Sequence, residues 1–133
     1  MVVKTDKLAT YAKMESDPDV ALKGQIFTKP QVAELILDLV GYKEDAPLSS
    51  RCLLDPGCGK GAFIIAAARR LVGSLGPKEG TAALTHSLLG VEKDKAILKV
   101  CRKNMSEALT QMGVESSEAK RLSRSWIVQG DFL

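Results

Sequence analysis

A glycine-rich segment after a short apolar run constrains the fold of this chain more than any other feature. The run Arg51–Asp55 ends in an acid, and Gly57, Gly59 and Gly61 follow at alternate positions before the alanine-rich stretch Ala62–Leu71. Glycine has no Cβ, so the backbone there can approach a ligand closely and adopt angles that other residues avoid. The run predicts a buried parallel strand, and the alanine-rich stretch predicts a helix whose first N–H groups are free. We therefore expect a ligand-binding turn between a strand and a helix, in preference to a plain connecting turn.

The rest of the chain continues the alternation of helices and strands. Helices are expected at Pro30–Val40, from Asp94 to about Met112 and within Glu115–Ser125, and strands at Ser87–Glu92 and Trp126–Gly130. The residues expected to face the core from the helix after Asp94 are Ala96, Ile97, Val100, Cys101 and Leu109, and Trp126 is expected to pack in the sheet. This order predicts an α/β fold in which right-handed crossovers join parallel strands. Ligands of such sheets bind beyond the carboxyl ends of the strands, where Asp55, Glu92 and Asp131 fall.

The residues around the glycines indicate which ligand the turn holds. The string from Gly57 to Ala62 also satisfies the dinucleotide pattern G-x-G-x-x-G/A. NAD binding, however, requires an acid about 20 residues further on, and Glu92 is much farther away. Asp55 would repel a pyrophosphate, whereas it suits the positively charged amino-acid end of S-adenosylmethionine. Glu92 could accept hydrogen bonds from both ribose hydroxyls, and Asp131 could accept one from the adenine amino group.

Two motifs resemble those of a known family. The segment Asp-Pro-Gly-Cys-Gly-Lys-Gly-Ala-Phe at residues 55–63 resembles motif I of the DNA amino-methyltransferases, and Gly24–Pro30 resembles motif X of the adenine-N6 enzymes. Glu92 matches motif II and Asp131–Leu133 matches motif III, so the resemblance covers Lys23–Leu133. It implies a Rossmann-like fold that depends on S-adenosylmethionine, represented here by its first three parallel strands with flanking helices. It also implies methyl transfer to adenine N6 in DNA, of the restriction–modification type.

The resemblance assigns a role to each matching position. Asp55, Gly57 and Gly59 would line the methionine part of the cofactor, and Phe27 and Thr28 would close over it. Glu92 would hold the ribose, and Asp131 with Phe132 would hold the adenine. The remaining motif I positions included in the cofactor site are Cys58, Gly61 and Phe63. The chain departs from the family at Lys60, where Ser or Thr is usual, and at Lys29, where the first Pro is usual; we expect Lys60 to face solvent at the start of the helix.

The largest departure is the absence of an Asn-Pro-Pro-Tyr-type motif IV, which in the family holds the target base flipped from the duplex. We therefore assign no catalytic residue. We expect the chain to be a fragment, made for expression, truncated as a gene product or one piece of a split enzyme. It would be inactive alone and would meet DNA through the missing part or through a partner chain. The edge where a fourth strand should pair predicts self-association or a complementing subunit.

Composition adds limits rather than a function. The net charge of +3 permits a DNA partner without arguing for one, and the basic positions from Lys93 to Lys103 are expected to form a solvated helix face. The three cysteines fit neither a disulfide framework nor a metal site. Neither a signal peptide nor a membrane span is apparent, so a cytoplasmic location is expected. We expect residues 1–23 to form a helical or extended segment, with a weak helical pattern at Thr5–Met14, ahead of the methyltransferase part at residues 24–133.

Two alternatives remain open. A methyltransferase acting on RNA, protein or a small molecule would share the glycine turn and Glu92, and only the motif X segment and the Asp55-Pro56 pair argue against it. A non-catalytic nucleotide-binding remnant would account for the missing motif IV.

Overall fold

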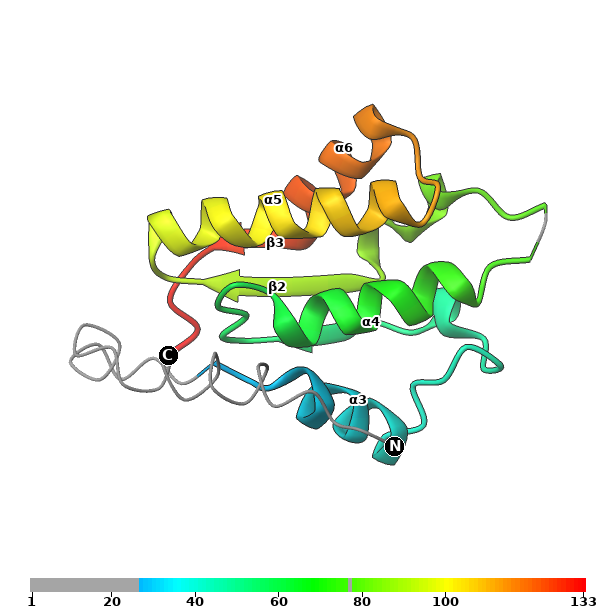
Figure 1. Ribbon diagram of the computed structural model, residues 1–133, viewed down its shortest axis with the longest axis horizontal. Coiled ribbons are helices and arrows are strands. Elements are labelled where there is room, and N and C mark those ends of the chain that lie inside the picture. Colours follow the sequence, from blue (N-terminus) through cyan, green and yellow to red (C-terminus); the bar gives the residue numbers. More distant parts are fainter. Residues whose placement is uncertain (1–26, 77) are drawn as a thin grey trace, which may run out of the picture.

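A computed structural model describes residues 27–76 and 78–133 of the chain, and these residues form one parallel sheet with helices packed beside it (Figure 1). The strands are β1 (Leu53–Asp55), β2 (Leu88–Glu92) and β3 (Ile127–Gln129), in the spatial order β1-β2-β3. Leu53 lies opposite Leu88, and Glu92 lies opposite Gln129. The predicted fold of three parallel strands with flanking helices is therefore confirmed. The predicted segment 1–23, the weak helix at Thr5–Met14 and the motif X residues 24–26 lie outside the described residues.

In the described part of the chain, four α-helices and two short 3₁₀ turns connect and cover the strands. They are α3 (Pro30–Leu39), α4 (Ala62–Gly73), α5 (Lys95–Gln111), α6 (Ser116–Trp126), η1 (Leu48–Ser50) and η2 (Thr81–His86). Pro30 begins α3 with its fixed backbone angle, and Gly41 follows the helix with φ of 68°. Asp94 begins α5 by accepting hydrogen bonds from Ala96 N at 2.8 Å and Ile97 N at 3.1 Å. These local signals explain why the predicted helix starts agree with the structure.

Two predicted details are wrong. Val100 is 41% exposed and Ala96 is exposed as well, because the helix turns a different face to the core. The buried residues of α5 are Leu98, Cys101, Met105, Ala108 and Leu109, a spacing of three and four residues. Trp126 ends α6 instead of lying in a strand. Its fully buried ring donates from Nε1 to Leu84 O at 2.8 Å, which ties α6 to η2.

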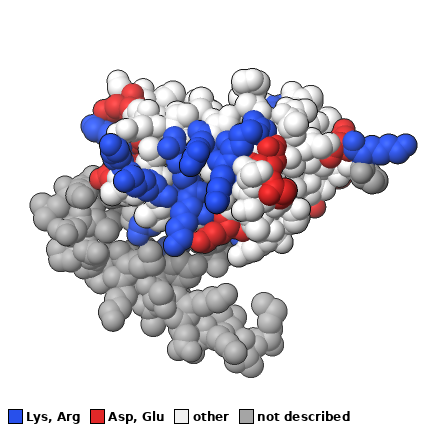
Figure 2. All heavy atoms as spheres, turned by 90° about the horizontal axis from the view of Figure 1, so that it is seen from above, with Lys and Arg blue, Asp and Glu red and all other residues white. Residues whose placement is uncertain are grey.

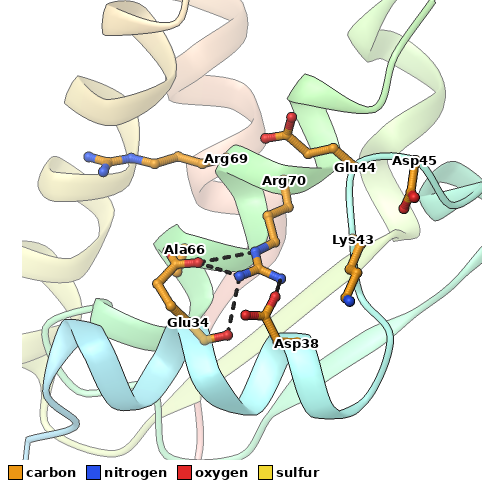
Figure 3. A pocket seen from close by; sticks show the side chains of 8 residues that line it. All are labelled: Glu34, Asp38, Lys43, Glu44, Asp45, Ala66, Arg69 and Arg70. Atoms are coloured by element: carbon orange, nitrogen blue, oxygen red, sulfur yellow. Dashed lines mark hydrogen bonds and ion pairs between the residues drawn. The ribbon is translucent and has the colours of Figure 1, made fainter.

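An arginine joins α3 to α4 (Figure 3). Arg70 on α4 forms ion pairs with Glu34 and with Asp38 of α3, the latter at 2.8 Å, and donates to Tyr42 O at 3.0 Å. Leu37 of α3 is fully buried. These contacts form a clamp that holds α3 against α4, and residues 27–29 come directly before α3. Within the described residues, no helix has the length and apolarity that crossing a bilayer requires.

Candidate cofactor site

The glycine-rich turn follows β1 and is held against the end of β2. Asp55 is the last residue of β1, and Glu92 is the last residue of β2. Cys58 N donates to Val91 O at 3.0 Å, and Gly61 N donates to Cys58 O at 2.9 Å before α4 begins. The turn and both acids therefore lie at the carboxyl edge of the sheet, where ligands of such folds bind.

The three glycines of the turn are required for three different reasons. A Cβ at Gly57 would meet no atom within 4 Å, so this position opens onto free space. Gly59 has φ of 53°, and a Cβ there would lie 3.3 Å from the ring of Phe27. Gly61 has φ of 101°, and a Cβ there would lie 2.8 Å from Ile65 Cδ1 and 3.0 Å from Cys101 Sγ. Gly57 thus leaves room for a ligand, whereas Gly61 allows α4 and α5 to pack closely.

Glu92 holds the turn in place. Its Oε2 accepts a hydrogen bond from Gly59 N at 3.0 Å, and its Oε1 accepts one from Asp94 N at 2.8 Å. The residue is 9% exposed. The sequence pattern suggested a ribose contact for Glu92 but gave no sign of this bracing role, because the contact to Gly59 spans 33 residues. Each carboxylate oxygen still has a second lone pair with which to accept a ligand hydroxyl.

Asp55 adds a second acid beside the turn. Its Oδ1 accepts a long hydrogen bond from Gly57 N at 3.4 Å. Burial raises the pKa of Asp55 above its ordinary value, the Gly57 hydrogen bond lowers it, and the nearby Glu92 carboxylate raises it further. Among the described residues, no Lys or Arg forms an ion pair with either Asp55 or Glu92. Within the described residues, the site is therefore an acidic edge whose two carboxylates have no Lys or Arg as an ion-pair partner.

Phe27 lies directly over the turn. Its ring would be the nearest group to a Cβ at Gly59, at 3.3 Å. Lys60 Nζ lies 4.9 Å from the centroid of the Phe27 ring. A cation over an aromatic face is a stabilising contact. Lys60 is exposed, as expected, but this contact with Phe27 was not foreseen. Thr28 is exposed just beyond, in the link to α3.

The residues predicted to hold the adenine, Asp131 and Phe132, follow the end of β3, where Gly130 N donates to Glu92 O at 3.0 Å. Asp131 forms an ion pair with Lys93 at 2.9 Å, and this hydrogen bond holds the pKa of Asp131 below its ordinary value. Phe132 is 57% exposed. To hold an adenine, Asp131 would have to give up or share its contact with Lys93.

The remaining motif I residues turn inward. Cys58 is buried with its Sγ 3.9 Å from Cys101 Sγ, and Phe63 packs against the core. The contact with Cys101 and burial raise the pKa of Cys58, which favours the neutral thiol. Any contact of Cys58 with a ligand would come from its backbone. Asn104 of α5, which the sequence did not single out, donates to Lys60 O at 3.1 Å and secures the end of the turn.

A separate hollow of about 660 Å³ lies between α3 and α4. Its lining residues are Glu34, Asp38, Lys43, Glu44, Asp45, Ala66, Arg69 and Arg70 (Figure 3). None of the predicted cofactor residues lines it, and its acids Glu34 and Asp38 are engaged by Arg70. We interpret it as the surface of the clamp between the two helices.

Comparison with known proteins identifies the family. The family model described as N-6 DNA Methylase matches residues 8–120. The chain is 36% identical over 117 residues to the type II methyltransferase M.BstVI of Geobacillus stearothermophilus, and 35% identical over 116 residues to M.XhoI of Xanthomonas vasicola. Each match covers 84% of this chain and 21% of the relative, so the chain spans about a fifth of their length. No solved structure matches significantly. With a family model that matches most of its length and a geometry in which strand ends, glycine turn and paired acids meet, the chain belongs to the N-6 DNA Methylase family.

Proposed function

We propose that this chain forms the cofactor-binding part of an enzyme that transfers a methyl group from S-adenosylmethionine to adenine N6 in DNA, as in restriction–modification. The observation that carries the proposal is the pair of acids, Asp55 and Glu92, beside a turn whose Gly57 opens onto free space. The names of the relatives, type II methyltransferases, agree with it.

The charge of the site favours a sulfonium compound over a dinucleotide. Two carboxylates that raise each other's energy are stabilised by a cation, and S-adenosylmethionine brings a sulfonium and an ammonium group. A pyrophosphate would add negative charge to the same edge, without a Lys or Arg paired to either acid in the described part of the chain to offset it. Gly57 and Gly59 match the dinucleotide sequence pattern, but the negative charge of the site does not suit a dinucleotide.

Each residue of the site has a task in holding the methyl donor. Gly57 would let the methionine part lie on the backbone, Asp55 would attract its ammonium group, and Phe27 would close over it. Glu92 would accept from the ribose while it keeps Gly59 in place. The donor supplies an electrophilic methyl group, and the residues of this chain fix its direction, because alignment with the attacking nitrogen provides much of the rate.

Calorimetric titration tests cofactor choice. We expect the chain to bind S-adenosylmethionine and to give no heat with NAD at the same concentration. Gly59→Val is the control, because Gly59 has φ of 53° and faces Phe27 at 3.3 Å, so the variant should lose the binding. Equal binding of NAD, or binding that survives in Gly59→Val, would contradict the proposal.

The division of labour within the enzyme gives a second test. The groups that hold a flipped adenine are expected outside this chain, so the chain alone should transfer no methyl group to DNA. Incubation with tritiated S-adenosylmethionine and unmethylated plasmid DNA measures this directly. Incorporation of label above the level seen with Gly59→Val would show that the chain already contains the base pocket.

An uncovered apolar surface supports a partner for the sheet. Among the described strands, β1 pairs only with β2, and Leu54 and Leu89, which lie side by side on one face, are 44% and 37% exposed. On α3, Leu35 and Leu39 are 57% and 77% exposed. We propose that a second copy or a complementing chain covers this surface. Sedimentation should reveal self-association at micromolar concentration, and a monodisperse monomer would count against it.

A further inference from the structure

The outer face of α5 carries basic side chains in a regular row. Between residues 95 and 106 the sequence has four basic residues and no acidic one. Lys95, Lys99 and Lys103 are exposed and follow one another at four-residue spacing, so they lie on one side of the helix. Lys103 has a weak pair with Glu107 at 3.9 Å. From the sequence alone such a row is expected to be a solvated face, and only its surroundings can indicate more.

The fold extends the row onto the neighbouring helix. Arg102 of α5 donates from Nε to Ile127 O at 2.9 Å, directly after the end of α6. Arg124 lies three residues before Ile127, and Lys120 lies four residues before Arg124. The two side chains are therefore spaced by about one helical turn along α6. Both are exposed, and neither forms an ion pair with another described residue. Two helices far apart in their sequence positions therefore contribute to one positive surface.

The hollow between α3 and α4 carries both signs of charge. Its acids Glu34, Asp38, Glu44 and Asp45 lie among Lys43, Arg69 and Arg70. Figure 2, which views the molecule from above relative to Figure 1, shows Lys and Arg side chains grouped in the middle of the surface, with Asp and Glu beside this group and toward the margins. A surface that serves solubility alone usually intersperses the two signs. The grouping of Lys and Arg on α5 and α6 (Figure 2) gives the molecule a side from which a polyanion would approach.

We propose that this surface contacts the phosphate backbone of duplex DNA. The residues of the basic face are Lys95, Lys99, Arg102, Lys103, Lys120 and Arg124. The row from Lys95 to Lys103 is about 12 Å long at 1.5 Å per residue. Duplex DNA carries one charge per about 1.7 Å of its axis, so a segment of that length presents about seven phosphates. The inference goes beyond the proposed methyl transfer, because it concerns side chains of α5 and α6 that are not among the residues of the glycine turn.

Fluorescence anisotropy with a labelled duplex of arbitrary sequence, without cofactor, tests the proposal. The variant Lys99→Ala/Lys103→Ala removes two charges from the basic face, and Lys43→Ala/Lys78→Ala removes two exposed lysines elsewhere. We expect the first to weaken binding about tenfold at low salt and to lower the slope of log K against log salt by about 1 per lysine. The control variant should bind like the unaltered chain, and circular dichroism should show both to be folded.

Three results would overturn the proposal. The unaltered chain could fail to bind duplex DNA at about 50 mM salt, the two double variants could lose affinity equally, or polyglutamate of equal charge could displace the duplex at equal concentration. The last result would point to an acidic protein as partner. Because no cofactor is present, a failure here leaves the methyltransferase proposal standing, and a failure to bind S-adenosylmethionine leaves this surface untouched.

Discussion

Substituting Gly57 tests whether this glycine is needed to leave space for a ligand and not for folding. A Cβ at Gly57 meets no atom within 4 Å, and φ there is not positive, so Gly57→Ala fits the free protein without strain. Gly80 has the same two properties and lies ahead of η2, away from the glycine turn. Replacing glycine by alanine at compatible positions stabilises a protein by about 0.4–1 kcal/mol, because the unfolded chain loses freedom. Both variants should therefore unfold at slightly higher urea concentration than the unaltered chain.

Cofactor binding should distinguish the two variants. If the methionine part lies on the backbone at Gly57, the added methyl group occupies ligand space, and forcing one extra carbon into a close contact costs about 1–3 kcal/mol. That corresponds to a loss of affinity of about five- to 150-fold. Calorimetry with S-adenosylmethionine should show this loss for Gly57→Ala and no loss for Gly80→Ala. Unchanged affinity in Gly57→Ala, with its stability also unchanged or raised, would refute the placement of the ligand on the turn.

Three further predictions concern stability. The pKa of Asp55 is higher in the folded protein than its unfolded value of 3.8, so the contribution of Asp55 to stability is present below 3.8 and is lost as pH rises through the folded value. In urea titrations, Asp55→Asn should therefore become more stable relative to the unaltered chain as pH goes from about 4 to about 8. A difference in stability that does not change with pH would contradict this. Gly61→Ala should cost about 1–2 kcal/mol of backbone strain and about 1–3 kcal/mol of overpacking against Ile65 and Cys101. Gly113→Ala is the control, because Gly113 has φ of 90° and no atom within 4 Å of an added Cβ, so this variant should cost the strain alone. Equal losses of stability on urea unfolding would exclude the packing role of Gly61. Tyr42 is buried, its hydroxyl has no hydrogen-bond partner within residues 27–76 and 78–133, and burial raises its pKa to about 12. Tyr42→Phe should therefore leave the thermal midpoint unchanged or raise it, and a clear fall would reveal an unseen partner.

Local patterns predicted the strands, the turn and the helix starts, because these depend on residues close in sequence. The proline at the start of α3, the Asp94 cap and the alternating glycines each act within a few residues of their own position. The same reasoning failed for the face of α5. Val100 and Leu98 are both apolar and two residues apart, and only the position of the sheet and α6 decides which one is buried.

The contacts that organise the site could not be predicted because they join distant segments. Glu92 reaches Gly59 across 33 residues and Asn104 reaches Lys60 across 44. The reason for Gly61 is partly remote, since the space for a side chain is taken by Ile65 of the same helix and by the Cys101 thiol of another helix. Sequence patterns identified the acids at the strand ends but not that Glu92 supports the turn while Asp131 pairs with Lys93. These are properties of how the elements pack against one another.

A crystal structure of the chain grown with S-adenosylmethionine tests the central claim most directly. We predict density for the methyl donor on the open side of Gly57, with its ammonium group beside Asp55 and its ribose within hydrogen-bond distance of Glu92. A turn that stays empty at saturating concentration, or density for the compound in the hollow between α3 and α4 instead, would contradict the account.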